Sequence, residues 1–297
     1  MTGAVRAIVG RNLRLFFRDR MAVFFSLLAA VILFTLYALF LGHLQVADLQ
    51  ESFPSATTAQ IRAFVDSWMF AGVVSMTAIT TGLGALGVLV EDTASGRFRD
   101  FLVAPIRSGQ LALGYLLSAV IVALTMTFFV FAVSLFYLSA VDGVALSFGA
   151  VMRAAAIVVV TAAAFSAISA FVTSFVSSPG AYAALSTIVG TVLGFLTGAY
   201  IPIGSFPESV QTVVSALPFA QASMLMRQEL ASGALSDLIS SAPEARGTML
   251  IYYGMAAEVA GWPLTAGSVL AVLIVLFVVF AWLGALRIRG RISAANR

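Results

Sequence analysis

Long apolar blocks alternate with short polar connectors along the chain. The blocks lie at about residues 21–41, 67–90, 111–138, 150–176, 181–201 and 263–286. A helix rises about 1.5 Å per residue, so about 20 residues cross a bilayer, and each block is long enough. Backbone groups in lipid must be satisfied within a helix or a closed barrel, and no block shows the alternation of a barrel strand. The pattern predicts an all-α integral membrane protein with six transmembrane helices in a single domain, residues 1–297.

The first 20 residues predict an amphipathic helix. One side of this helix holds Val5, Ile8, Val9, Leu13, Phe16 and Phe17, and the other holds Arg11, Arg14 and Arg18. Such a helix is expected to lie in the membrane interface with its arginines near anionic lipid phosphates. A simple cytoplasmic anchor explains the same pattern.

Residues 202–262 form a second unusual stretch, between the fifth and sixth predicted spans. The stretch contains an amphipathic piece with Val210, Val213, Val214 and Leu217 on one helical face. It is too apolar for a solvated loop, so we expect short re-entrant helices that are sheltered by protein. In contrast, only Ser177–Gly180 separate the fourth and fifth spans, which predicts a tight turn between antiparallel neighbours.

The connector after the second span, residues 91–110, concentrates charge between two apolar blocks. Phe98, Phe101, Leu102 and Pro105 follow helical spacing, so a short helix would present one apolar stripe. Pro105 disfavours helix at the residue before it and ends this helix. Such an element is suited to docking a soluble partner, and an interfacial helix resting on lipid is the alternative.

Composition narrows the chemistry. Hydrophobic residues make up 61% of the chain, charged residues only 10%, and the mean hydropathy is +1.05. Cysteine is absent, so thiolate chemistry is excluded, and His43 is the single histidine, which excludes multi-histidine metal sites. All 16 basic residues are arginine. A P-loop requires lysine at the phosphates, so this chain is not a standard P-loop ATPase.

Arginine placement predicts the orientation. Twelve arginines fall in the N-terminal stretch, the connector after the second span and the C-terminal tail, leaving Arg62, Arg153, Arg227 and Arg246 on the other face. The positive-inside rule then makes both termini cytoplasmic. The arginine-only, alanine-rich and valine-rich composition is typical of a GC-rich bacterial genome, so a bacterial plasma membrane is expected.

Two stretches resemble a known family. "EDTASGRFRDFLVAPIRSGQLALGYLL" is similar to the connector of ABC-2 type permeases, the membrane subunits of ABC exporters, including drug-export and G-subfamily-like transporters. The matching residues are Glu91, Gly96, Phe101, Leu102, Pro105 and Gly114. "FPESVQTVVSALPFAQASMLMR" is similar to the family's stretch after span five, with Pro207, Pro218 and Arg227 in matching places. Asp92 departs from the pattern, because many relatives have arginine there.

The resemblance implies a mechanism and partners. Glu91 to Ile106 would form the coupling helix and its flank, with Glu91, Gly96, Arg97, Phe98, Phe101, Leu102 and Pro105 facing a groove of a separate ATPase subunit. ATP and Mg²⁺ would bind that subunit, so this chain would hold no cofactor or metal and have no catalytic residue of its own. A second permease copy, or a related permease, would complete the transporter among membrane lipids, without nucleic acid.

Two residue sets predict interior surfaces. Gly190, Gly194 and Gly198 form overlapping G-x-x-x-G motifs, which permit close helix approach either inside the subunit or across a dimer. Met69, Phe70 and Met76 are candidates to line a path for a hydrophobic substrate. Packing inside the subunit is the commoner explanation for glycines in this pattern, and contact with lipid is the commoner explanation for apolar side chains such as those of the second set.

Two other functional classes stay open. An integral membrane enzyme would place its chemistry in residues 202–262, but no acids, histidines or serines converge there by spacing. An ion-coupled carrier generally buries ionisable groups at mid-membrane, and the predicted span cores hold almost none. An apolar interior favours drugs, lipids or hydrophobic natural products as substrates, with glycans as an alternative.

Overall fold

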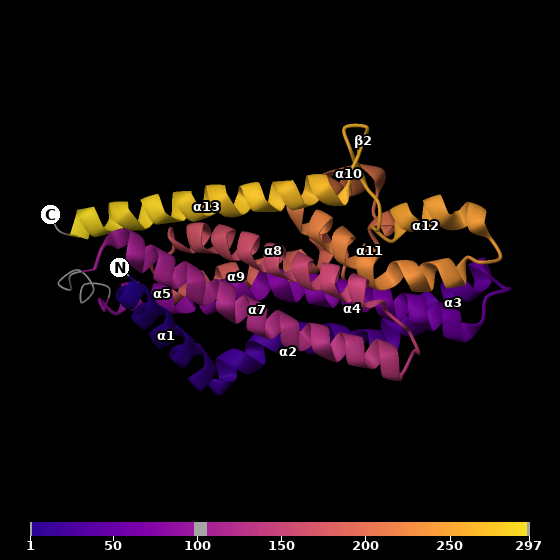
Figure 1. Ribbon diagram of the computed structural model, residues 1–297, viewed down its shortest axis with the longest axis horizontal. Coiled ribbons are helices and arrows are strands. Elements are labelled where there is room, and N and C mark those ends of the chain that lie inside the picture. Colours follow the sequence, from indigo (N-terminus) through magenta and orange to yellow (C-terminus); the bar gives the residue numbers. More distant parts are fainter. Residues whose placement is uncertain (1, 98–105, 296–297) are drawn as a thin grey trace.

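The computed structural model describes residues 2–97 and 106–295, which are almost entirely helical (Figure 1). Within these residues, six helical segments are long and apolar enough to cross a membrane. They are Arg20–Ser52, Thr58–Ala94, Ser108–Ala140, Phe148–Thr173, Pro179–Leu196 and Ala266–Ile288. The predicted six-span, all-α architecture is confirmed.

The N-terminal stretch folds as a helix, α1, which is set at an angle to the first span (Figure 1). Asp19 separates the two, and its carboxylate accepts hydrogen bonds from the backbone N–H groups of Met21 and Ala22 at 2.9 and 3.1 Å. An aspartate at this position satisfies amide groups that the first turn of a helix leaves free. The elements here are α1 (Thr2–Arg18), α2 (Arg20–Leu36), a π-helical turn (Tyr37–Leu41) and α3 (Gly42–Ser52).

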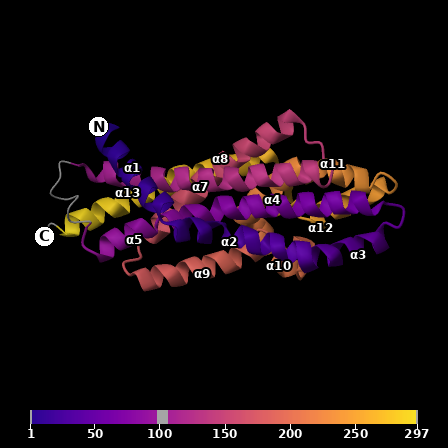
Figure 2. The ribbon, with the colours of Figure 1, turned by 90° about the horizontal axis from the view of Figure 1, so that it is seen from below.

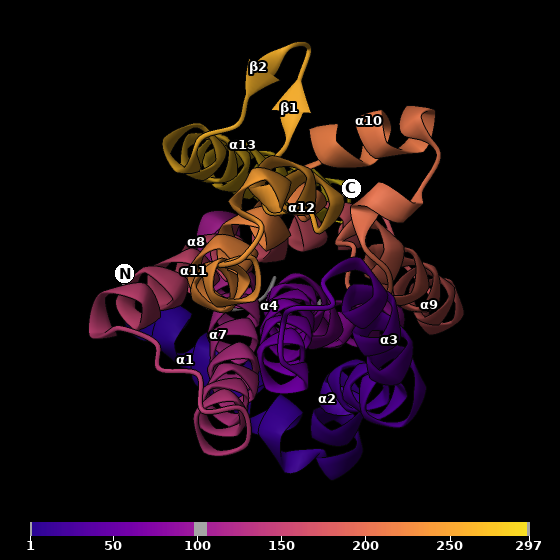
Figure 3. The same ribbon diagram turned by 90° about the vertical axis from the view of Figure 1, so that its right-hand side faces the viewer.

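The second span lies at the centre of the bundle (Figures 2 and 3). Its main helix, α4, packs against α2, α3, α7, α8, α9 and α11. A capping box between Thr57 and Gln60 starts α4 well before the apolar block that marks this span. The span and its principal neighbours are α4 (Thr58–Ala85), α5 (Gly87–Ala94), α7 (Ser108–Ala140), α8 (Phe148–Thr173) and α13 (Ala266–Ala295).

The fifth span, α9 (Pro179–Leu196), differs from expectation in its neighbours. Ser178 caps it through the amide of Ala181, with Pro179 at the first helical position, so the turn after α8 is tight as predicted. However, α9 packs mainly against α4 and α5 rather than against α8. A short turn fixes the two helix ends close together but does not fix the angle at which the helices diverge.

The segment between the fifth and sixth spans contains short helices and one long helix. The short ones match the expectation, whereas α11 spans 21 residues and is buried along most of its length. It packs against α4, α8 and α13. The elements are a 3₁₀ turn (Ile203–Ser205), α10 (Glu208–Ala216), α11 (Pro218–Leu238), a 3₁₀ turn (Pro243–Ala245), α12 (Arg246–Tyr252) and the antiparallel pair β1 (Glu258–Val259) and β2 (Trp262–Pro263).

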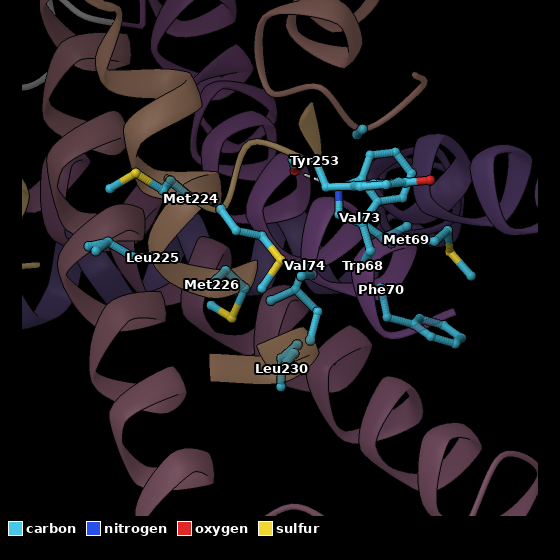
Figure 4. Packing of buried hydrophobic residues seen from close by; sticks show 14 of the residues in the cluster. Trp68, Met69, Phe70, Val73, Val74, Met224, Leu225, Met226, Leu230 and Tyr253 are labelled. Carbon is cyan, nitrogen blue, oxygen red and sulfur yellow. Dashed lines mark hydrogen bonds between the residues drawn. The ribbon is translucent and has the colours of Figure 1, made fainter. Parts of the chain in front are cut away.

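The hydrophobic core forms where α4 meets α11 (Figure 4). Trp68 of α4 is fully buried, and its indole N–H donates to the carbonyl of Tyr253 at 2.8 Å. The Tyr253 ring in turn meets Phe64 edge-on, at a centroid distance of 4.8 Å. Aromatic pairs in this geometry add to the stability gained by burial. This cluster therefore holds the segment between the fifth and sixth spans against the second span.

Arg227 of α11 is fully buried in the same region. Its guanidinium lies over the Trp68 ring, 5.0 Å from the centroid, and donates to the carbonyls of Thr197 and Gly198 at 2.9 and 2.7 Å. These carbonyls lie at the C-terminal end of α9, where a helix attracts positive charge. A Cβ atom on Gly254 would lie 2.9 Å from the guanidinium, so glycine there leaves room for the arginine.

We predict that Arg227→Met lowers the melting temperature of the purified protein by a few degrees. The change leaves two buried carbonyl groups without donors, at a cost of about 1–3 kcal/mol. Fluorescence-detected unfolding in detergent measures it. Arg246→Met, at an exposed arginine that donates to Ser236, is the control, and equal melting temperatures for the two variants would contradict the role of Arg227.

Candidate functional site

The residues predicted to couple to a partner lie around the end of the second span. Glu91 and Arg97 are exposed there. Gly96 has a φ of +77°, the left-handed conformation that ends many helices, and it follows the last turn of α5. The other predicted coupling residues lie outside the described residues; they are Phe98, Phe101, Leu102 and Pro105.

Asp92, the neighbour of Glu91, points inward and is only 1% exposed. Its two carboxylate oxygens accept from the guanidinium of Arg11, each at 2.6 Å. The Tyr115 hydroxyl donates to the same carboxylate at 2.6 Å, and Arg97 approaches it to 3.9 Å. We call Arg11, Asp92 and Tyr115 the Asp92 cluster, and it joins α1, α5 and α7 in one place.

Further contacts hold α1 against α7 beside this cluster. Asn12 donates to the Ser118 hydroxyl at 3.3 Å. Ile8 is buried against Gly114, where an added Cβ would lie 2.6 Å from an Ile8 methyl carbon. The hydrogen-bonded Asp92 carboxylate raises the pKa of Arg11 above its ordinary value, against the opposing effect of burial. Arg11 therefore stays protonated at physiological pH.

The second span is interrupted just before this cluster. Its α-helix ends at Ala85 and resumes at Gly87, and the Leu86 amide at the break donates to the carbonyl of Leu83 at 2.9 Å. The Tyr182 hydroxyl of α9 donates to the carbonyl of Leu83. A Cβ on Gly87 would lie 3.2 Å from the Tyr182 ring, so glycine permits this approach. The start of the fifth span is thus attached to the break in the second.

A groove of about 550 Å³ opens on the side of the bundle between α2, α4 and α9. Its walls are mostly apolar, with hydroxyl groups at several positions. The hydroxyl-bearing residues are Ser26, Thr80, Thr81, Tyr182, Ser186 and Thr187. Both α2 and α9 are among the least buried spans, with 11% of each span's apolar window inside the protein. We call this the lateral groove.

Residues 3–231 match the family model described as ABC-2 type transporter. The match spans most of the chain, including the first five spans and every residue of the Asp92 cluster and the lateral groove. The chain belongs to the ABC-2 type transporter family. The comparison with curated proteins finds no match.

Membership makes this ABC-2 chain a transmembrane permease component of an ABC transporter and a multi-pass membrane protein. Among the described residues, no three histidine, aspartate or glutamate side chains gather closely enough to hold a metal ion. Between the fifth and sixth spans, Glu229 pairs with Arg153, whose guanidinium approaches its carboxylate to 2.9 Å. This acid therefore serves an ion pair between α11 and α8.

The glycines of the fifth span of this permease do not share one helical face. Gly190 lies within α9 with open space where a side chain would project. Gly194 is covered by the Tyr200 ring. Gly198 lies beyond the end of α9, with a φ of +64°, against Arg227. The prediction of a continuous G-x-x-x-G face is wrong for Gly198, because the helix ends at Leu196.

The predicted path residues of the permease lie inside the subunit. Met69, Phe70 and Met76 are 2–4% exposed, and Figure 4 shows Met69 and Phe70 among the core residues of α4. Phe70 also borders a smaller apolar pocket of about 180 Å³ between α2 and α7. None of the three lines the lateral groove, so their role in transport stays a prediction.

Sequence reasoning did not find the Asp92 cluster or the lateral groove. In the sequence, Asp92 is notable only because it departs from the family pattern, in which many relatives have arginine. The available signal was an acid on the apolar side of a helix end, with Arg11 as a cation on a helix predicted for the same membrane face. Residues 11 and 92 are distant in the chain, so only the fold of the permease shows that they meet.

We predict that the Arg11–Asp92 pair contributes about 2 kcal/mol of coupling energy to the stability of this permease, because one partner is nearly inaccessible to solvent. The measurement is a double-mutant cycle with Arg11→Gln, Asp92→Asn and both changes together. The matched control is a cycle on Arg153 and Glu229, a pair whose arginine side chain is 64% exposed, so that solvent screening makes a clearly smaller coupling energy the expected result. Equal coupling energies would contradict the structural importance of the Asp92 cluster.

Proposed function

We propose that this chain is the membrane half of an ATP-driven exporter, working as a symmetric dimer or with a related permease. The observation that carries this proposal is the path of the second span. One segment, Thr58–Ala94, borders the lateral groove at Thr80 and Gly84, is interrupted at Leu86, and ends at the connector with Glu91. A push on the connector would therefore reach the groove through α5 and α4, two consecutive helices of the same span.

The connector is the proposed docking surface for a separate ATPase subunit. Its exposed flank offers Glu91 and Arg97, and its sequence offers the apolar side chains of Phe98, Phe101 and Leu102. The chain has no lysine with which to build a P-loop, so ATP and Mg²⁺ would bind the partner. The Asp92 cluster supports this role, since it braces the base of the connector against α1 and α7.

The lateral groove is proposed to form one half of the translocation path, and a second permease would supply the other half. It is open on the side where α2 and α9 are least buried, so a second permease placed against this side would close it into a central path. Apolar walls with scattered hydroxyl groups suit a hydrophobic or amphiphilic molecule such as a drug, a lipid or a natural product. Alternation between the two sides of the membrane would carry that molecule outward.

The proposed location is a bacterial plasma membrane with both termini in the cytoplasm. The start of α1, the end of α5, the start of α7 and the C-terminal part of α13 gather at one end of the bundle (Figure 1). The connector and C-terminal arginines belong to these segments and their flanks, as does Arg6 of the N-terminal stretch, which supports a cytoplasmic face for this end by the positive-inside rule.

We predict that a P-loop ATPase co-purifies with the protein from native membranes and that Phe101→Asp reduces its recovery several-fold. The carboxylate would be desolvated in an apolar contact. Quantitative mass spectrometry of the purified complex measures recovery. Phe148→Asp is the matched control, because Phe148 is 79% exposed and begins α8 at the opposite end of the bundle.

Equal ATPase recovery with both variants would move the docking surface away from Phe101. If no ATPase is recovered with the unmodified protein, even after chemical crosslinking, the proposed exporter function is wrong. An ion-coupled carrier or an external enzyme would then be the remaining classes.

We predict that Gly190→Cys forms disulfide-linked dimers in native membranes, several-fold faster than Ile274→Cys. The chain has no cysteine of its own, so each variant carries a single thiol. Gly190 borders the lateral groove with open space beside it, whereas Ile274 lies on α13 and is 52% exposed. Non-reducing electrophoresis after mild oxidation measures the rates, and equal rates would contradict a dimer that pairs through α9.

A further inference from the structure

A second and larger groove lies between α1 and α7, away from the lateral groove. Its volume is about 990 Å³, and the two helices that form it pack side by side (Figures 1 and 2). One wall is a stripe of Leu113, Leu117 and Ile121, spaced four residues apart along α7 and 37–45% exposed. Val5 and Val9 of α1 line the other side. We call this the α1–α7 groove.

The apolar stripe has the length of one lipid leaflet. Leu113 to Ile121 covers about 12 Å at the rise of an α-helix, and one leaflet contributes about 15 Å of hydrocarbon. The stripe starts one to two turns into α7, which begins at Ser108. A chain laid along the stripe would therefore enter the bilayer from the interface without crossing its midplane.

Two arginines give this apolar groove a polar end. Arg107 immediately precedes α7, and Arg6 lies on α1 between the two valines of the groove wall. Both are exposed, and neither forms an ion pair with any of the residues that the structure describes. Two cations next to an apolar channel match a molecule with an anionic head and a long hydrocarbon tail.

We propose that the α1–α7 groove binds one anionic phospholipid from the leaflet that contacts α1. The phosphate lies at Arg6 and Arg107, and an acyl chain runs along Leu113, Leu117 and Ile121. A free phosphate ion would leave the apolar stripe unused, and a zwitterionic lipid such as phosphatidylcholine would bring a quaternary ammonium group next to the arginines along with its phosphate. This proposal concerns the permease alone, so it holds or fails independently of the proposed exporter function.

The bound lipid would act on the position of α1. One side of α1 is held by Arg11 in the Asp92 cluster and by Ile8 against Gly114, and the lipid would occupy the gap on its other side. The helix would then be supported on both sides, next to the connector that follows α5. The lipid is therefore a structural partner at the base of that connector.

The test is native mass spectrometry of the purified full-length protein in mixed micelles. The micelles contain either phosphatidylglycerol or phosphatidylcholine with identical acyl chains. We expect one phosphatidylglycerol retained per chain and much weaker retention of phosphatidylcholine. Arg6→Gln with Arg107→Gln should weaken phosphatidylglycerol binding roughly thirtyfold, since each basic residue near an anionic surface contributes about 1 kcal/mol, a factor of about five.

The control is Arg14→Gln with Arg18→Gln. It also removes two positive charges, but from residues of α1 that do not line this groove. Equal weakening by the two double variants would overturn the proposal in favour of general attraction to basic residues. Equal retention of the two lipids would overturn it as well.

A second comparison tests the apolar half of the site. Leu117→Trp fills the groove but keeps both arginines, so it should reduce lipid retention at least tenfold, whereas Ile274→Trp on α13 should have no effect. Unchanged retention with Leu117→Trp would place the lipid elsewhere. Displacement of the lipid by millimolar inorganic phosphate would identify a site for free anions, and the proposal would then be wrong.

Discussion

Burial of the second span on nearly all sides is the constraint from which the rest of the architecture follows. Its apolar window is 78% buried, far more than that of any other span among the described residues. An apolar helix in a membrane can also face lipid, as the first and sixth spans do with 11% and 17% of their apolar windows buried, so the burial of the second span comes from the helices packed around it. Six other helices provide that cover, and the second span contacts the segment of residues 202–262, borders the lateral groove and contributes Asp92 to the Asp92 cluster.

The two ends of this central helix carry buried charge in different ways. At the connector end, Asp92 is neutralised by a bidentate arginine, which offsets the cost of removing a carboxylate from water. Nearer the other end, Arg227 of α11 packs on Trp68; it contacts no carboxylate among the described residues and is held by carbonyl dipoles and the Trp68 ring. Helix ends and aromatic faces supply partial negative charge, so a cation is tolerated there without a counter-ion.

Six spans and the N-terminal helix could be predicted from sequence because hydrophobic length and helical periodicity are local signals. The long buried helix α11 could not, since Gln221, Arg227 and Asp237 give it a mixed pattern that resembles an exposed segment. Its burial arises from packing against distant helices, and Arg227 is accommodated only by groups from α4 and the end of α9. The Asp92 cluster and the lateral groove depend on three helices each, so no single stretch of sequence carries their signal.

The attachments of the fifth span give it an unusual mechanical character. Near its start, the Tyr182 hydroxyl is bonded to the second span, and just past its end, the carbonyls of Thr197 and Gly198 are bonded to Arg227. Between these ends, only Leu193 and Gly194 are buried. A helix that is attached at both ends and has few contacts between them bends most near its middle. Gly190 lies between the two attachments and borders the lateral groove. Sideways bending of α9 would therefore widen or narrow the groove while the hydrogen bonds at both ends stay intact.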